Sequence, residues 1–335
     1  MGQKTNPNIL RLGVTKNWKT EFFEKKKKEL PLYVFKDLEI QSYIERFFES
    51  KTIVFKNKQS TPMGIFVHDY YQYYSDNVLN LHISYLVSPR SNFNVFEKRK
   101  SVSVINSSGN KKIINYSNEH FLSDSTFVKI NSFDENTSKK MYNTKKYLDV
   151  NYFDKNISNF RSNTFNNSLE NMLRVISNFT FNKFDIVVNF SCINKDFNYL
   201  SFLKTKKVRM LQKFKSNPFF KDGLELLFHV AFNKNSARLL AKFISIQLKV
   251  IKRPNFFLAF IKQTLTILIS SKLSTLKGVK IILKGRLSKG PRAKHKILSI
   301  GDVAVQSLNC NMDYFQTTTH NSNGSYGIKV WVVGK

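Results

Sequence analysis

A cluster of positive side chains near the carboxyl end has the chemistry of a phosphate-binding site. The segment 289–296 reads Lys-Gly-Pro-Arg-Ala-Lys-His-Lys, and Gly290 and Pro291 stiffen it as a loop. Arg292 can place a planar guanidinium on a phosphate through two parallel hydrogen bonds. Together with the preceding strand, the cluster comprises Lys280, Lys284, Arg286, Lys289, Arg292, Lys294, His295 and Lys296. We expect phosphate contact here, with a solvated charged loop as the alternative.

The net charge of the chain points to the same chemistry. The 54 Lys+Arg and 23 Asp+Glu residues give a net charge of +31. Residues 204–335 alone hold 25 Lys and Arg against four acids, an excess of +21. Such an excess repels itself in a compact protein unless a polyanion neutralises it. The charge favours nucleic acid as the partner, with an anionic membrane surface second, and argues against an ordinary cytosolic enzyme.

The sequence carries no pattern typical of a catalytic, metal or cofactor site. It has no Gly-rich phosphate loop, no nucleophile elbow and no His-Glu-x-x-His motif. Cys192 and Cys310 have no nearby Cys or His partner, which argues against a zinc site and a disulfide framework. Asp302 and Asp313 could form a carboxylate pair, but acids at such positions more often serve turns and strand ends. We expect no enzymatic activity, no metal and no cofactor.

Composition and the amino terminus bear on where the protein is made. The 31 Phe against 12 Gly and 7 Pro favour residues with A/T-rich codons, which indicates an organellar genome or a reduced bacterium. The opening residues 1–7 fit neither a signal peptide nor a mitochondrial presequence. The longest apolar stretch, 256–269, is interrupted by Lys262 and is too short to cross a membrane. We expect no membrane span, and a protein used where it is synthesised.

Apolar periodicity predicts an α+β organisation with one long interruption. A helix is expected from an N-cap at Asp37 to about Glu49, and a short helix near 168–176. Strands are expected at 52–55, 80–86 and 184–190. The expected divisions are a basic arm at 1–35, the first part of a domain at 36–87, a low-complexity insertion at 88–182, a final strand at 183–203 and a C-terminal domain at 204–335.

The insertion is rich in Asn, Ser and Lys, and no apolar period persists along it. We interpret 88–182 as partly disordered. The strands that precede and follow it must still meet, so we expect the two ends of the insertion to lie close together at the surface.

The C-terminal domain is predicted to be a two-helix, four-stranded antiparallel α/β sandwich. Ser236 is the expected N-cap of the first helix, and Asn255 opens the second, which ends before Gly278. The expected strands lie at 279–284, 303–308, 312–319 and 326–333. The residues 324–327, Gly-Ser-Tyr-Gly, match the G-x-x-G backbone clamp of KH domains. Because that clamp joins two helices, a hairpin turn is the favoured interpretation here.

Both ends of the chain resemble the family of small-subunit ribosomal protein three. The opening carries Met1-Gly2-Gln3-Lys4-x-Asn6-Pro7, Arg11-Leu12-Gly13 and Trp18. The carboxyl end carries Gly278-Val279-Lys280-Ile281, Gly285-Arg286-Leu287, Gly301-x-Val303, Asp313-Tyr314 and Tyr326-Gly327-Ile328-Lys329-Val330-Trp331. The resemblance covers roughly residues 1–56 and 184–335. It implies an arm, a type-II KH domain and an α+β C-terminal domain on the head of the small subunit.

The resemblance also implies partners, namely small-subunit rRNA, neighbouring head ribosomal proteins and mRNA at the entry channel. The chain departs from the family after Ser88, where the G-x-x-G clamp is missing, so we expect a degenerate KH domain that scaffolds. The helix after Arg253 has few of the family's basic residues, which weakens the expectation of mRNA unwinding. The expected RNA-binding residues are Lys4, Arg11, Lys16, Lys19, Lys252, Arg253, Lys262, Lys280, Lys284, Arg286, Lys289, Arg292, Lys294, His295, Lys296 and Lys329.

The leading hypothesis is a structural constituent of the small ribosomal subunit that supports mitochondrial translation in the matrix. The insertion, the A/T-rich composition and the missing presequence together fit a protein encoded in the organelle. The alternative is a free KH-derived RNA-binding factor that acts in organellar mRNA processing. The missing clamp counts against this alternative, because an isolated KH domain needs the clamp to hold RNA.

Overall fold

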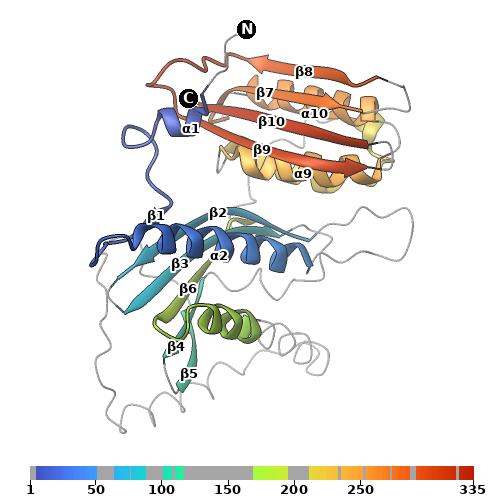
Figure 1. Ribbon diagram of the computed structural model, residues 1–335. Helices are drawn as coiled ribbons and strands as arrows, with labels where there is room; N and C mark the ends of the chain where they lie inside the picture. The colour runs from blue at the N-terminus through green and yellow to red at the C-terminus, as the bar shows by residue number, and fades with distance from the viewer. Residues whose placement is uncertain are drawn as a thin grey trace, which may run out of the picture.

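The computed structural model is built around two separate β-sheets flanked by helices, which confirms the α+β fold class (Figure 1). For residue 50 and for the strands at 101–107 and 110–116 only the backbone is described. The structure describes residues 5–50, 64–75, 77–87, 101–107, 110–116, 169–194, 211–232, 235–251, 254–271, 274–286, 292–321 and 324–335.

The N-terminal sheet has the strand order β1-β2-β3-β6-β4-β5. Its strands are β1 (Thr20–Glu21), β2 (Ile65–Tyr74), β3 (Val78–Val87), β4 (Ser101–Ser107), β5 (Asn110–Tyr116) and β6 (Asp185–Cys192). β2 and β3 form an antiparallel hairpin, and β6 runs parallel to β3. The predicted strands at 80–86 and 184–190 are confirmed, whereas β2 was not predicted. The predicted strand at 52–55 lies outside the described residues.

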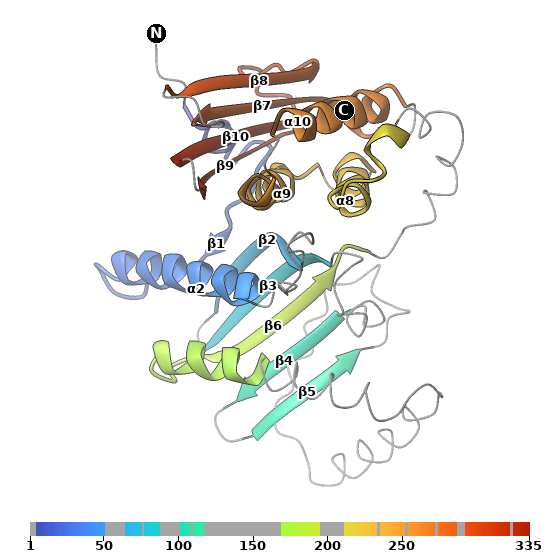
Figure 2. The same ribbon diagram turned by 90° about the vertical axis from the view of Figure 1, so that its right-hand side faces the viewer.

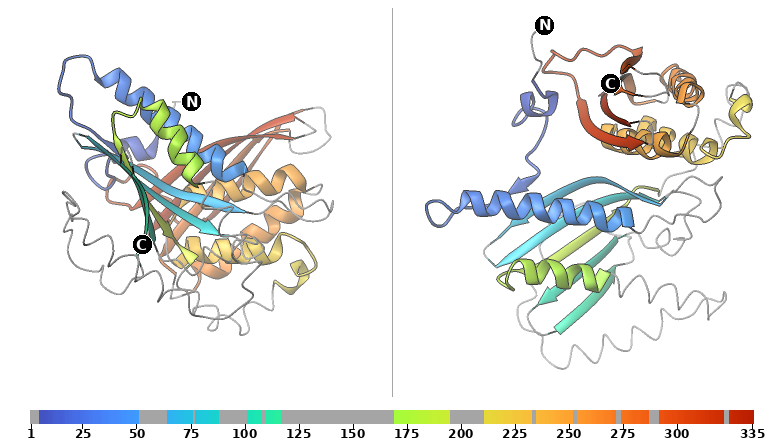
Figure 3. Two further views of the ribbon diagram at one scale, coloured as in Figure 1. Left: turned by 90° about the horizontal axis from the view of Figure 1, so that it is seen from below. Right: turned by 45° about the vertical axis from the view of Figure 1, so that its right-hand side comes forward.

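Two helices cover one face of this sheet. Alternate residues of β3 and β6 are buried beneath them, among them Leu81 and Val188. Helix α2 (Leu30–Ser50) contributes Ile40, Ile44 and Phe48, which recur every four residues and therefore share one face. A second helix over residues 169–179 lies beside α2 and contributes Leu169, Met172, Leu173 and Ile176 (Figure 3). The helix predicted near 168–176 is confirmed.

Helix α2 begins seven residues before the predicted N-cap. It starts at Leu30, whose amide donates to Glu24 Oε1 at 2.8 Å, so a side chain six residues earlier caps the helix. Asp37 therefore lies inside α2, where Thr20 Oγ1 donates to its Oδ2 at 2.7 Å. The prediction of Asp37 as N-cap is wrong, because the arm folds back to supply the cap.

The segment between β3 and β6 connects two parallel strands. In the register of this pair, Val78 lies opposite Asp185 and Tyr85 opposite Cys192. The end of β3 and the start of β6 are therefore at opposite ends of the sheet, and the prediction that the ends of 88–182 lie close together is wrong. Part of that segment forms β4 and β5, which extend the sheet beyond β6 and were not predicted.

The C-terminal sheet is four-stranded and antiparallel, as predicted, and its strand order is β8-β7-β10-β9. Its strands are β7 (Leu276–Gly285), β8 (Lys294–Gly301), β9 (Met312–Asn321) and β10 (Gly324–Gly334). β8 pairs with β7 from Lys294 to Gly301, so the strand predicted at 303–308 is wrong, and its bounds lie seven to nine residues too late. Residues 324–327 begin β10 in a β-hairpin, which confirms that they are not a clamp between helices.

Three helices, rather than the two predicted, lie beneath the C-terminal sheet (Figure 2). They are α8 (Phe220–Phe232), α9 (Ala237–Val250) and α10 (Pro254–Ile269). Ser236 caps α9 as predicted, with its Oγ accepting from the Leu239 amide at 3.3 Å. α9 and α10 pack on the sheet, and α8 packs on both of these helices. Pro254 opens α10, one residue before the predicted Asn255.

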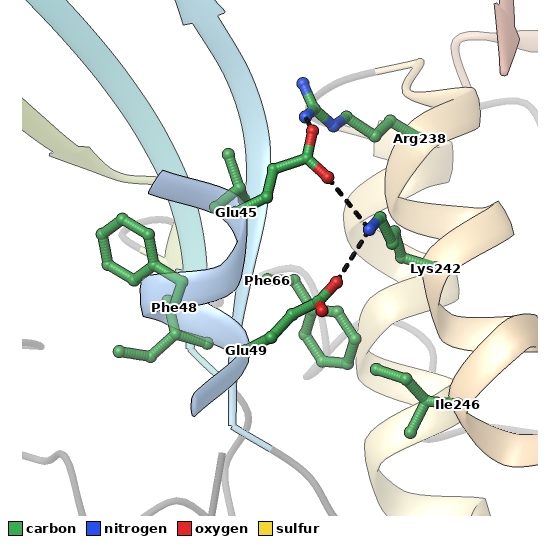
Figure 4. A pocket seen from close by; sticks show the side chains of 9 residues that line it. Glu45, Phe48, Glu49, Phe66, Arg238, Lys242 and Ile246 are labelled. Carbon is green, nitrogen blue, oxygen red and sulfur yellow. Dashed lines mark hydrogen bonds and ion pairs between the residues drawn. The ribbon is translucent and has the colours of Figure 1, made fainter. Parts of the chain in front are cut away.

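An ion-pair cluster joins the two halves of the molecule where α9 faces α2 (Figure 4). Arg238 of α9 pairs with Glu45 of α2, and Lys242 Nζ lies 3.1 Å from Glu45 Oε2 and 2.8 Å from Glu49 Oε1. Burial disfavours the charged carboxylate, but Arg238 and Lys242 hold the pKa of Glu45 below its ordinary value. Phe66 of β2 is buried in the same apolar cluster as α8 and α9.

Candidate nucleic-acid interface

The C-terminal sheet buries one face and exposes lysines on the other. On β7, Val279, Ile281 and Leu283 are fully buried against the helices, so Lys280 and Lys284 point to the opposite side. Helices α8, α9 and α10 leave this opposite side, which we call the outer face, uncovered (Figure 2). The short helix α1 (Pro7–Leu10) contacts the edge strand β9. By register the outer face comprises Lys280, Ile282, Lys284, His295, Ile297, Ser299, Tyr314, Gln316, Thr318, Gly327, Lys329 and Trp331.

The strand register brings three lysines of the outer face together. Lys280 and Lys284 lie on β7, and Lys329 of β10 stands opposite Ile282, between them along the strand. His295 of β8 stands opposite Lys284. Neighbouring strands are about 4.8 Å apart, so the three lysines form one positive surface at the scale of phosphate spacing, with His295 beside it.

An aromatic pair adjoins these lysines. The rings of Tyr314 and Trp331 have centroids 5.1 Å apart, and Lys280 Nζ lies 5.9 Å from the centre of the Trp331 ring. Aromatic rings beside lysines can stack on unpaired bases while the lysines hold phosphates. Sequence patterns alone do not mark this pair as functional, although Tyr314 and Trp331 both stand in the motifs shared with the ribosomal family.

No acidic side chain among the described residues lies on the outer face. Asp313 of β9 stands opposite Val332, which is fully buried, and so points toward the helices. Its Oδ2 accepts from the Ala237 amide at 2.7 Å at the start of α9. Burial raises the pKa of the Asp313 carboxyl, although Lys16 and the Ala237 amide favour its charged form. Asp313 therefore has a structural role.

The basic segment at the end of the sheet is partly a strand, which corrects the loop expected at 289–296. Lys294 and His295 are exposed on β8, and Lys296 is half-buried and donates to Asn255 Oδ1 at the start of α10. Arg286 and Arg292 are exposed at the ends of β7 and β8. Lys289 lies outside the described residues. Arg286, Arg292 and Lys294 therefore extend the positive surface beyond the outer face.

Arg11 is not available to RNA. Its side chain is fully buried and donates to four backbone carbonyls, those of Pro7 at 3.0 Å, Val305 at 3.0 Å, Cys310 at 3.3 Å and Ser307. These contacts bind the arm to the connection between β8 and β9, and they explain why 303–308 forms no strand. The expectation that Arg11 contacts RNA is therefore corrected to a structural role.

The remaining expected residues are dispersed. Lys16 Nζ lies 3.8 Å from Asp313, and Lys19 Nζ lies 2.9 Å from Asp69, so both form ion pairs within the protein. Lys262 is exposed on α10, away from the outer face. Lys4, Lys252 and Arg253 lie outside the described residues.

Other kinds of site are not indicated within the described residues. No group of His, Cys, Asp and Glu side chains there is arranged to hold a metal ion. None of the helices in that part of the chain has the length and apolar character needed to cross a membrane. Both cysteines are unbridged.

Comparison with known proteins decides the family. Residues 257–332, which contain most of α10 and the C-terminal sheet, match the family model described as Ribosomal protein S3, C-terminal domain. Small ribosomal subunit protein uS3c of Euglena longa is 31% identical over 153 residues, covering 40% of this chain and 68% of that protein. The chain belongs to the uS3 family of small-subunit ribosomal proteins. This family is one of ribosomal proteins and is not an enzyme family.

Other uS3 relatives match a shorter part. The uS3 protein of Neorickettsia sennetsu is 33% identical over 98 residues, 29% of this chain and 44% of its own length. The uS3c protein of Guillardia theta is 33% identical over 96 residues, 29% of this chain and 42% of its own length. The chain thus spans about two thirds of one uS3 relative and less than half of these two.

Proposed function

We propose that the chain is an rRNA-binding structural constituent of an organellar small ribosomal subunit, and that the outer face contacts the RNA. One observation carries this proposal: Lys280, Lys284 and Lys329 lie together on one face of the sheet, beside the Tyr314–Trp331 pair. Among the described residues, no acidic side chain lies on that face. Lysines on such a face gain affinity by releasing counterions from phosphates. Membership of the uS3 family gives this surface a ribosomal context.

The finer parts of the proposal concern placement in the cell and in the subunit. We propose that the ribosome is mitochondrial, because the composition favours residues with A/T-rich codons. We also propose that the chain lies on the head of the subunit near the mRNA, which the exposed Lys262 contacts. uS3c names among the relatives are consistent with an organelle. We further propose that the N-terminal half is a degenerate KH domain, because α2, the β2–β3 hairpin, the helix at 169–179 and the parallel β6 follow in that order.

The RNA-binding face is tested by the salt dependence of binding to rRNA fragments of the same ribosome. Replacement of Lys280, Lys284 and Lys329 by Ala removes three phosphate contacts. Each contact contributes about 0.7 to 0.9 to the slope of log affinity against log salt. The slope should therefore fall by about 2 to 3. The melting temperature should change little, because Lys284 is exposed and the half-buried Lys280 and Lys329 lie on the face opposite the core.

The matched control replaces Lys26, Lys27 and Lys28, three exposed arm residues, by Ala. This variant loses the same formal charge away from the outer face, so its slope should fall by much less. Equal slopes for the two variants would show that net charge, and not the outer face, governs binding. An unchanged slope for the outer-face variant would refute the proposed contact surface.

A further inference from the structure

Gly327 is a glycine that the described fold of the chain does not require. It lies inside β10, which runs between β7 and β9 in the C-terminal sheet (Figure 1). Its φ is not positive, and a Cβ added to it would meet no atom of the described chain within 4 Å. Every other glycine described in this sheet has a positive φ or lies where a Cβ would come within 3 Å of another atom. Those glycines are therefore explained by the chain itself, and Gly327 is not.

A glycine in the interior of a strand is unfavourable on its own account. It has no side chain to pack, and it loses more conformational freedom on folding than any other residue. Such a glycine often marks the place where a ligand or a second backbone approaches the strand closely. The described chain supplies no such group at Gly327, which leaves a binding partner as its source.

The side chains that border Gly327 suit a phosphate group. In the register of the sheet, Gly327 stands opposite Lys284 of β7 and Thr318 of β9, and both of these residues are exposed. Lys329 is on the same face, two residues and about 7 Å further along β10. Two ammonium groups and a hydroxyl group thus surround a point without a side chain, and all three can donate hydrogen bonds to phosphate oxygens.

Further positive charge lies at the same end of the outer face. Arg286 directly follows β7, and its Cβ is 3.6 Å from the position that a Cβ of Gly324 would occupy. His295 stands opposite Lys284 on β8. Attraction between a phosphate and these cations weakens as their separation increases. A phosphate therefore gains most where it can come close to the sheet, and the missing side chain at Gly327 permits that approach.

We infer that Gly327 is the point of closest approach between the protein and the sugar–phosphate backbone of the RNA, with one phosphate above its Cα between Lys284 and Lys329. The occupant is a phosphate rather than a protein segment, because cations and a hydroxyl group border the position and no described acid lies on this face. This inference rests on the proposed function, since it takes RNA as the partner of the outer face. It adds that shape, as well as charge, limits the contact.

Binding of the full chain to small-subunit rRNA of the same organism, transcribed in vitro, tests the inference. Gly327→Ala adds one methyl group and changes no charge, so we expect affinity to fall at least fivefold with little change in melting temperature. Gly327→Val should weaken binding further and yet raise the melting temperature, because a β-branched residue favours a strand. A purely structural role for Gly327 would not move affinity and stability in opposite directions.

The matched control is Ser299→Thr, which also adds one methyl group to the outer face. Ser299 is exposed on β8 opposite Lys280, away from Gly327, so affinity should stay within twofold of the wild type. A double-mutant cycle adds a second measurement. In a Lys329→Ala chain the phosphate has already lost one of its cations, so the further loss caused by Gly327→Ala should be smaller than in the wild type.

Three results would overturn the inference: wild-type affinity for Gly327→Ala, an equal loss for Ser299→Thr, or full additivity of Gly327→Ala with Lys329→Ala. A melting temperature that falls in parallel with affinity for Gly327→Val would also overturn it. Failure of the proposed function gives a different result, because the variant without Lys280, Lys284 and Lys329 would then bind RNA like the wild type. If that variant loses affinity and Gly327→Ala does not, the proposed function stands and only this inference fails.

Discussion

Replacing Glu45 by Gln should weaken the junction between the two halves of the molecule. The Arg238 side chain is only 5% exposed, and Glu45 is 24% exposed. Removal of one partner from a fully buried pair costs about 3–5 kcal/mol. Here the cost should be smaller, about 2 kcal/mol, because Glu45 is partly solvated, Gln can still accept a hydrogen bond, and Lys242 keeps Glu49. For a chain of 335 residues we expect a fall in melting temperature of about 3 °C.

The effect should depend on pH in a defined direction. The folded state lowers the pKa of Glu45 below its unfolded value. The stabilisation is therefore fully present above the ordinary carboxyl pKa and is lost as the pH falls through the folded-state pKa. Urea unfolding followed by tryptophan fluorescence should separate the wild type from Glu45→Gln at pH 7, and the two curves should converge at low pH.

A control on the same helix makes this prediction refutable. Glu39 is exposed on α2, so Glu39→Gln should leave stability at pH 7 within about 0.5 kcal/mol of the wild type. If Glu45→Gln matches Glu39→Gln at pH 7, the ion-pair cluster contributes no stability. If the difference between Glu45→Gln and the wild type persists at low pH, its cause is not the charge of Glu45.

Three further predictions follow from the geometry. Gly301→Ala should cost about 1–3 kcal/mol in thermal unfolding, because its φ is +69° and a Cβ would lie 2.3 Å from the Lys277 carbonyl, whereas Gly327→Ala should be near neutral because no atom lies within 4 Å. Arg11→Met should speed amide exchange and proteolysis between β8 and β9, since it removes four hydrogen bonds; unchanged protection would contradict the assigned role. Replacing 88–182 by a four-residue Gly/Ser linker should disrupt the N-terminal sheet, as measured by circular dichroism, because the chain must then span about 30 Å from the end of β3 back to the start of β6. RNA affinity of the C-terminal domain should persist.

Much of the C-terminal domain could be predicted from its sequence. β7 and β10 alternate apolar and polar residues, and Ser236 stands directly before an amphipathic helix, so local pattern and tertiary structure agree. β8 was misplaced because three of its first residues are basic and suited a loop, while 303–308 had the β-type residues. Only the distant Arg11 shows why those residues do not pair, since it binds their carbonyls.

The candidate surfaces were harder to predict than the strands. The lysines of the outer face were chosen for charge, and that choice included Arg11, whose burial depends on a contact almost 300 residues away in sequence. The parallel pairing of β3 with β6 was also beyond periodicity, because a strand pattern does not encode direction. The groove between the N-terminal arm and α2 brings together Trp18, Val34 and Asp313 from three distant segments, and no local sequence motif predicts it.

The central claim is that this uS3 family member is built into a small ribosomal subunit. The most direct measurement is quantitative mass spectrometry of gradient fractions from lysed organelles, washed at high salt and scaled to small-subunit rRNA. The proposed function predicts about one copy per subunit rRNA and little chain at the top of the gradient. A predominantly free chain, or one that leaves the subunit at moderate salt, would contradict it and favour a free RNA-binding factor.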